Sequence, residues 1–356
     1  MNDRERFRRL MAFEPIDRLP VMALEPFEQS AIERWRTEGL PDGAHPGEFL
    51  DMSTFAGVPL SLGPVPAFEQ TVLAEDAGSV TQISSMGATV KSMKEQPSLF
   101  YGHVDHPIKT RRDWDEYKLR FDATSPGRHP ADLTALAQRL EQSPNPVHLS
   151  LFPCFFRFGF YSMGMERFLT AFYEEPELMH EIFAHLGRFY LDLVKPILDV
   201  VRVDCVTLNE DLAGKNGPLI SPSLYQEFWC PNQDPLITLC KERGVQVVCM
   251  WSAGGLDPLL SGLIEHGFNC TWPLEAMAGM DAVDLRQRYG RDLLLGGNIA
   301  KEAVITGPDA IDAEIERLRP LIREGGFLPA LDDMASPDMP FTHYRYLIES
   351  LQKIGE

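Results

Sequence analysis

Basic residues are scarce in this chain, which has 33 lysines and arginines against 52 aspartates and glutamates and a formal net charge of −19. Nucleic acids and anionic membranes bind proteins through basic patches, so we expect neither as a partner. The same excess of negative charge disfavours a polyanionic substrate unless a local basic pocket overrules it. We therefore expect a small-molecule substrate, which is compatible with the negative net charge.

Three other signals are missing. The six cysteines never form a CxxC pair and several lie in apolar runs, which predicts reduced core residues of a cytoplasmic protein. The start, MNDRERFRRLM, is charged, and no apolar run approaches the roughly 18 residues of a membrane span. We therefore expect neither export nor membrane insertion. No GxGxxG follows an early strand and no Walker loop occurs, which disfavours an open nucleotide-binding sheet.

What the sequence does contain is a regular alternation of strands and helices from residue 130 onward. The stretch QVVCMWSAGG at 246–255 is typical of a buried strand that ends in a tight turn. Similar apolar runs predict strands at 148–152, 205–208, 268–272, 293–295 and 327–331, with helices between them. This rhythm indicates a parallel sheet with covering helices, and at 356 residues an α/β fold of the closed (β/α)8 TIM-barrel type is favoured.

The N-terminal part of the chain is less regular. We predict a helix at 3–12, a first strand at 18–25 that delivers Glu25 to its end, and a hairpin strand at 88–93. Proline and glycine are frequent between residues 26 and 130, but no low-complexity linker separates this region. We therefore predict a single domain over 1–356, in which residues 26–130 are partly an irregular elaboration.

Polar side chains at strand ends are the candidate site residues, because barrel enzymes place their chemistry at the carboxyl ends of the strands. Asp211 is interpreted either as a helix cap or ion-pair partner, or as a proton-transfer group, and Glu275 has the same two interpretations. Asp332 and Asp333 form a carboxylate pair suited to a metal or a shared proton, but adjacent strand residues point to opposite faces. The aromatic run FFRFGFY at 155–161 is either core or the lining of a pocket for a flat substrate.

These considerations assign catalytic roles to three carboxylates, which are Asp211, Glu275 and Asp333. They assign substrate binding to a larger set, which comprises Glu25, Asn209, Glu210, Trp251, Ser252, Asn298, Asp332 and Tyr161. No histidine lies at a clear strand end, so no histidine base is predicted.

Several stretches resemble one known family: RERFRRLMAFEPIDRLPV at 4–21, MERFLTAFYEEPELMHEIF at 165–183, EDLAGKNGPLISPSLYQEFWCP at 210–231, GGNIAKEAV at 296–304 and GGFLPALDD at 325–333. Together with the SAGG turn they resemble the uroporphyrinogen decarboxylase superfamily over nearly the whole chain. The chain is more similar to the corrinoid-dependent methyltransferase and uncharacterised branches than to the haem-pathway decarboxylases, whose arginine-rich N-terminal glycine motif is not visible. The resemblance implies a TIM barrel, and members of the superfamily often form homodimers.

One departure from the methyltransferase pattern concerns zinc. The resemblance places the His-x-Cys zinc-binding pair of these enzymes at Trp251 and Ala253, neither of which is a zinc ligand. Near the last strand the chain has Asp332-Asp333 where related proteins often have Asp-His. We therefore predict no metal ligands of the usual kind, and Cys249 is only a weak substitute ligand.

The resemblance implies three alternative functions. The first is the methyltransferase component of a corrinoid-dependent demethylation system, which moves a methyl group from a small methylated compound, such as an aryl methyl ether, to a corrinoid on a separate partner protein. The second is a metal-independent decarboxylase of a small aromatic acid. The third is a degenerate, non-catalytic binding protein. The sequence leaves the choice among them open.

Overall fold

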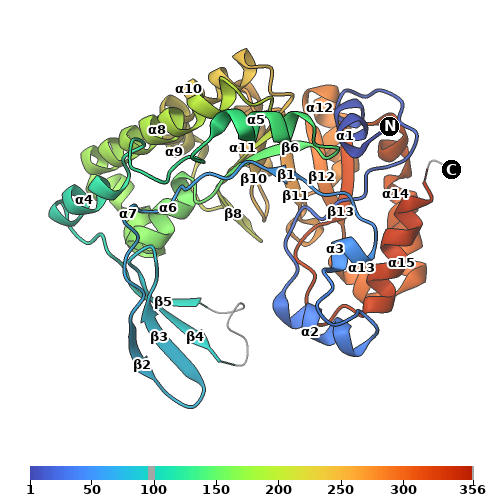
Figure 1. Ribbon diagram of the computed structural model, residues 1–356, viewed down its shortest axis with the longest axis horizontal. Coiled ribbons are helices and arrows are strands. Elements are labelled where there is room, and N and C mark those ends of the chain that lie inside the picture. Colours follow the sequence, from blue (N-terminus) through green and yellow to red (C-terminus); the bar gives the residue numbers. More distant parts are fainter. Residues whose placement is uncertain (95–100, 355–356) are drawn as a thin grey trace.

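A curled parallel sheet of seven strands forms the centre of the computed structural model, which describes residues 1–94 and 101–354 (Figure 1). Its strands, in spatial order, are β1 (Ala56–Gly57), β6 (Val147–Leu151), β7 (Cys205–Asn209), β10 (Val247–Trp251), β11 (Cys270–Leu274), β12 (Leu294–Ile299) and β13 (Phe327–Leu331). The last three are buried along their whole length, as expected for strands covered on both faces. All the strands predicted after residue 130 are confirmed, with ends that differ from the prediction by at most four residues.

Helices follow these strands in the predicted rhythm and cover the sheet. They are α5 (Leu133–Glu141), α8 (Pro176–Leu198), α10 (Cys230–Glu242), α11 (Asp257–Glu265), α12 (Ala282–Tyr289), α13 (Lys301–Thr306), α14 (Pro308–Glu324) and α15 (Phe341–Gln352). The α8 helix buries an apolar stripe spaced three and four residues apart, which includes Leu178, Ile182 and Leu186. Pairing of successive strands in parallel through helical crossovers confirms the α/β architecture.

The predicted strand at 18–25 is wrong in detail. Within it, Met22 makes one isolated bridge to Ser53 beside β1, and Phe27, two residues beyond it, makes another to Ala335 beyond β13. Supporting hydrogen bonds run from the Ser53 amide to the Val21 carbonyl and from the Glu28 amide to the Ala335 carbonyl. Pro20 and Pro26 each lack an amide donor, which prevents a continuous ladder here. The segment therefore lies between the two edges of the sheet without forming a regular eighth strand, and the closed (β/α)8 arrangement is realised only in part.

The N-terminal region contains α1 (Asp3–Met11), α2 (Gln29–Thr37), α3 (Pro46–Phe49) and α4 (Arg111–Tyr117). It also contains an antiparallel sheet of β2 (Val72–Glu75), β3 (Ser79–Ile83), β4 (Thr89–Met93) and β5 (Tyr101–Asp105), which confirms the predicted hairpin strand at 88–93. In Figure 1 this sheet lies at the lower left and α2 at the lower right, on opposite sides of the molecule. The N-terminal region thus extends the molecule on two sides.

Several short elements were not predicted. They are α6 (Phe155–Met163), α7 (Met165–Glu174), three 3₁₀ turns (Lys118–Arg120, Ala276–Ala278 and Gly290–Asp292) and the small hairpin of β8 (Ala213–Gly214) and β9 (Gly217–Pro218). The elements α9 (Pro222–Leu224) and a π-helix (Tyr225–Trp229) lie between β7 and β10, where a helix was predicted. The aromatic run at 155–161 belongs to α6, where Phe155, Phe156 and Phe158 are core residues. All six cysteines are buried free thiols. Within residues 1–94 and 101–354, every helix is too short or too polar to cross a bilayer.

Candidate active site

The carboxyl ends of the parallel strands open into a cavity of about 560 Å³, here called the central cavity. Its lining comes from the strands β6, β7, β10 and β11, from α6 and from the segments that follow residue 23 and residue 331. The lining residues are Leu24, Glu25, Pro26, His148, Ser150, Phe152, Arg157, Thr207, Asn209, Asp211, Trp251, Ala253, Trp272, Pro273, Asp333 and Met334. Five predicted site residues therefore lie together: Glu25, Asn209, Asp211, Trp251 and Asp333.

Glu25 is the most perturbed acid in this cavity. The indole N–H of Trp251 donates a hydrogen bond to its Oε1 atom. Burial raises the pKa of Glu25 to about 8, and the nearby Asp333 carboxylate adds to the rise, although the Trp251 contact opposes it. The Glu25 carboxyl is therefore largely protonated at neutral pH.

Arg157 connects α6 to the strand ends. Its guanidinium lies 4.8 Å from the ring centre of Trp251 and 5.2 Å from that of Phe152, and it forms an ion pair of 3.1 Å with Asp211. Burial raises the pKa of Asp211, whereas Arg157 lowers it. Asp211 also has a positive φ of 65°, an uncommon backbone conformation for a non-glycine residue. Arg157 therefore contacts both the aromatic rings of Trp251 and Phe152 and the Asp211 carboxylate, and holds them in place.

The strand residues of the cavity contribute neutral polar groups. The His148 Nε2 atom lies 2.8 Å from the Thr207 hydroxyl across β6 and β7. Burial lowers the pKa of His148 to about 4, so its imidazole is neutral at physiological pH. Asn209 is tied to the start of α6, because its carbonyl accepts a hydrogen bond of 3.3 Å from the Cys154 amide. This side of the cavity therefore offers uncharged hydrogen-bonding groups.

The two adjacent aspartates after β13 point in different directions, as strand geometry predicts. Asp333 lines the central cavity and forms an ion pair of 2.5 Å with Lys301. Asp332 is instead buried, accepts hydrogen bonds from the amides of Ala276 and Lys301, and has its pKa raised by burial to about 6. The pair therefore does not act as one two-carboxylate unit.

Six predicted residues lie outside the lining of the central cavity, and all but Tyr161 hold loops or helices through hydrogen bonds. The fully buried Glu210 accepts hydrogen bonds from the Phe156 amide at 2.6 Å and from Gln233 at 2.7 Å, and burial raises its pKa to about 7. Ser252 accepts from the Leu212 amide. The Glu275 carboxylate accepts from the Gly254 amide at 2.8 Å.

Tyr161 is one helical turn beyond Arg157 on α6. The Arg157 Nη1 atom donates to its hydroxyl at 3.3 Å, and its ring packs edge-on against Phe152. Tyr161 thus contacts two residues that line the cavity, Arg157 and Phe152, but does not itself line it.

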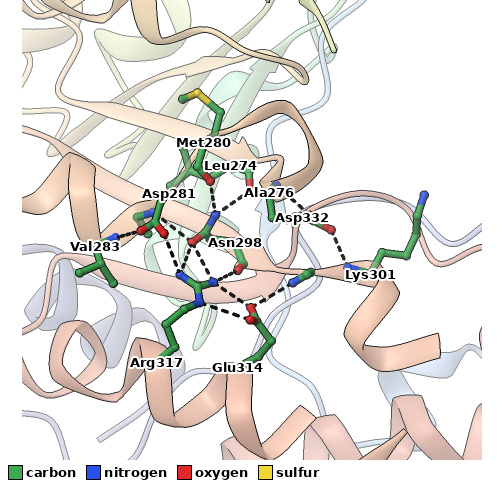
Figure 2. A network of polar contacts seen from close by, with 12 residues as sticks. Leu274, Ala276, Met280, Asp281, Val283, Asn298, Lys301, Glu314, Arg317 and Asp332 are labelled. Carbon is green, nitrogen blue, oxygen red and sulfur yellow. Dashed lines mark hydrogen bonds and ion pairs between the residues drawn. The ribbon is translucent and has the colours of Figure 1, made fainter. Parts of the chain in front are cut away.

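Asn298 organises a polar network at the end of β12 (Figure 2). Its side-chain amide donates to the carbonyls of Leu274 and Met280, and its oxygen accepts from the Ala282 amide and from Arg317. The residue is fully buried and has a positive φ of 66°. These bonds attach the loop after β11 to β12, which places Asn298 among the structural supports of the site.

The residues present do not fit the zinc site of the methyltransferases. Trp251 and Ala253 line the central cavity at the two positions in question, and neither side chain is a zinc ligand. Cys249 is fully buried beside Cys270, which is its partner in strand register, and burial raises the pKa of its thiol. Across residues 1–94 and 101–354, no group of three His, Cys, Asp or Glu side chains is arranged to hold a metal ion.

Two functional candidates were missed from the sequence. Arg157 lies in an aromatic run that was interpreted as core or lining, and His148 is the second residue of β6, far from the strand end. Strand alternation could have identified His148, because the buried Val147 and Leu149 flank it and leave it on the opposite face. No local pattern marks Arg157, since its partners Asp211 and Trp251 are distant in sequence.

Comparison with known proteins agrees with this architecture. The chain is 23% identical to the uroporphyrinogen decarboxylase of Xanthomonas euvesicatoria pv. vesicatoria (strain 85-10) over 380 aligned residues, which cover 99% of each chain. Among solved structures, a methyltransferase from Methanosarcina mazei matches with a TM-score of 0.63 and 15% identity over 100% of both chains, which shows a common fold. The family model described as uroporphyrinogen decarboxylase (URO-D) matches residues 79–354, and the chain therefore belongs to the uroporphyrinogen decarboxylase family.

Proposed function

We propose that this protein is an acid-assisted methyltransferase, which removes a methyl group from a small uncharged aryl methyl ether and passes it to a corrinoid on a separate partner protein. The observation that carries the proposal is the buried Glu25 carboxyl, which lies beside Trp251 in an aromatic-lined cavity and whose pKa burial raises to about 8. Removal of a methyl group from an ether oxygen requires a proton or a Lewis acid at the leaving oxygen. Glu25 supplies that proton without a metal.

The charges around the cavity favour an uncharged substrate. Apart from the Glu25 carboxyl, the acidic and basic side chains in its described lining are Asp211, Asp333, Arg157 and the neutral His148. Arg157 is already paired with Asp211, and Asp333 with Lys301, so a substrate carboxylate would meet acidic groups whose partners are taken. The aromatic faces of Trp251, Trp272 and Phe152 suit a flat, neutral ring. These features count against the alternative of an aromatic-acid decarboxylase.

The proposed step conserves atoms and charge. The bond between methyl carbon and ether oxygen breaks as the nucleophilic acceptor on the partner takes the methyl group, and the Glu25 proton goes to the departing oxygen. The product is a phenol, and water then reprotonates Glu25. Three carboxylates were first assigned to catalysis. Asp211 and Asp333 form ion pairs with Arg157 and Lys301, and Glu275 accepts a hydrogen bond from the Gly254 amide. We therefore assign the acid to Glu25.

The test is anaerobic incubation with reduced free cobalamin and a panel of aryl methyl ethers, following methylcobalamin by absorbance and phenol by chromatography. Replacement of a general acid typically costs about 10² to 10⁴ in rate, so we expect Glu25→Gln to lose at least about 100-fold. Glu28→Gln is the matched control, because Glu28 lies three residues away and outside the central cavity. It should retain the rate of the unmodified protein.

Two other outcomes would replace this proposal. Release of carbon dioxide from a panel of aromatic acids, without methyl transfer, would establish the decarboxylase alternative. Stabilisation of the protein by panel compounds, without any product, would indicate a non-catalytic binding protein. Equal methyl-transfer rates in Glu25→Gln and the unmodified protein would refute the role of Glu25.

A further inference from the structure

A second cavity of about 410 Å³ adjoins the central cavity. Both cavities are lined by Leu24, Glu25 and Pro26, so this short segment belongs to both. The other walls of the second cavity come from α2, from the segment before α3 and from residues 52–55. Glu25, the proposed acid, therefore has one cavity on either side.

Phe55 separates the two cavities. Its ring lines the second cavity and also packs against two residues of the central cavity, with ring-centre distances of 4.6 Å to His148 and 6.4 Å to Trp272. The ring is only partly buried. A molecule in the central cavity therefore lies a single side chain away from the second one.

The polar side chains of the second cavity are engaged by the protein itself. The His45 Nδ1 atom accepts from the Gly47 amide at 3.2 Å, and the Ser53 hydroxyl donates to Asp3 at 2.7 Å. The Thr54 hydroxyl accepts from Asn145 at 3.5 Å. The remaining surface is formed by Ile32, Met52, Phe27 and other apolar groups. An occupant would thus gain from burying apolar surface more than from hydrogen bonds.

We propose that the second cavity is a binding subsite for an apolar substituent of the substrate, with Phe55 as the residue that limits the width of that substituent. The substrate class is then an aryl methyl ether that carries an alkyl or aryl group away from the methoxy group. Only the position of the methoxy end, beside Glu25, rests on the proposed function. Binding of the apolar substituent in the second cavity does not depend on the proposed function.

Isothermal titration calorimetry with anisole and its 4-methyl, 4-ethyl and 4-butyl derivatives tests the subsite without turnover. Burial of each added methylene should tighten Kd by roughly fourfold. Thr54→Trp and Ile32→Trp each place a large ring in the second cavity. In both variants we expect unchanged affinity for anisole and loss of the gain with chain length. Leu119→Trp is the control, because Leu119 is exposed and lies outside both cavities, and it should keep the gain.

Circular dichroism would verify that each variant is folded before titration. A gain with chain length that survives in both folded blocking variants, or no gain in the unmodified protein, would overturn the subsite. Phe55→Leu provides an independent measurement, since a narrower partition should admit branched 4-substituents that the unmodified protein rejects. A chain-length gain without methyl transfer would leave the subsite in place and reject only the proposed function.

Discussion

Glu25 makes both activity and stability depend on pH. Its pKa is raised from an ordinary 4.5 to about 8, chiefly by burial. Activity that needs the Glu25 proton should fall as pH rises through about 8. Between pH 4.5 and 8 the unfolded chain releases this proton while the folded chain retains it, so the free energy of unfolding should decrease as pH rises over that range. Rate profiles and melting temperatures from pH 5 to 9 measure the two effects.

Glu25→Gln isolates this contribution, because Glu210 and Asp332 also have raised pKa values and titrate in the same range. The melting temperature of Glu25→Gln minus that of the unmodified protein should increase as pH rises, because only the unmodified protein loses this contribution, and it should level off above about pH 8. A difference that is constant from pH 5 to 9 would show that Glu25 titrates normally.

Asn298 combines buried hydrogen bonds with an unfavourable backbone conformation. Asn298→Ala leaves the groups bound by its side chain unpaired and keeps a β-carbon at φ 66°, so we expect a loss of about 3 kcal/mol in the free energy of unfolding. Asn298→Gly loses the same bonds but relieves the conformational cost, which should recover about 1 kcal/mol. Urea unfolding of the two variants gives the comparison. Equal stability of both would mean that the backbone conformation costs nothing here.

At the scale of whole elements, one glycine sets how closely two helices approach. A β-carbon at Gly187 of α8 would lie 2.8 Å from the Asn232 carbonyl of α10, whereas one at Gly262 of α11 would meet nothing within 4 Å. Gly187→Ala should therefore destabilise the protein by about 2 kcal/mol. Gly262→Ala should stabilise it by about 0.5 to 1 kcal/mol, because alanine is the better helix former. Thermal unfolding of the two variants should shift in opposite directions, and parallel shifts would contradict this account of the helix contact.

Most elements after residue 130 could be predicted from sequence, because a buried parallel strand is a short apolar run and its crossover helix has a distinct period. The segment at 18–25 was predicted as a strand on the same grounds, but its one bridge is to Ser53, a partner that no local pattern reveals. The site was predictable where a residue ends a strand, as with Asp211. The pKa of Glu25 and the position of Arg157 follow from tertiary contacts.

The rule that polar residues at strand ends belong to the site also led to a wrong assignment for Glu210. Glu210 and Asp211 are adjacent in sequence, yet Glu210 is fully buried against the start of α6, whereas Asp211 lines the central cavity. A polar residue at a strand end can therefore either face the substrate or support the neighbouring element. Sequence alone does not separate these two cases, because the choice depends on which backbone amides lie nearby.

For the molecule as a whole, the donor set around Trp251 and Ala253 leads to a prediction about metals. Because neither side chain is a zinc ligand, we expect the purified protein to contain no stoichiometric zinc, and treatment with a chelator should leave its melting temperature unchanged. Elemental mass spectrometry and a thermal melt with and without EDTA measure these quantities. One zinc per chain, lost together with stability on chelation, would show that other ligands have replaced the usual ones.

The loosely bridged N-terminal segment has a consequence for biosynthesis. Glu25 is held by a segment that meets the sheet at Ser53 and Ala335, and the neighbouring α2 is anchored where the Trp35 indole donates to the Met339 carbonyl, 304 residues later in the chain. Ser53 is translated soon after Glu25, but Ala335 and Met339 are translated only after all the parallel strands, including β13. The segment that carries Glu25 can therefore complete its contacts only near the end of synthesis, after the parallel sheet has been translated.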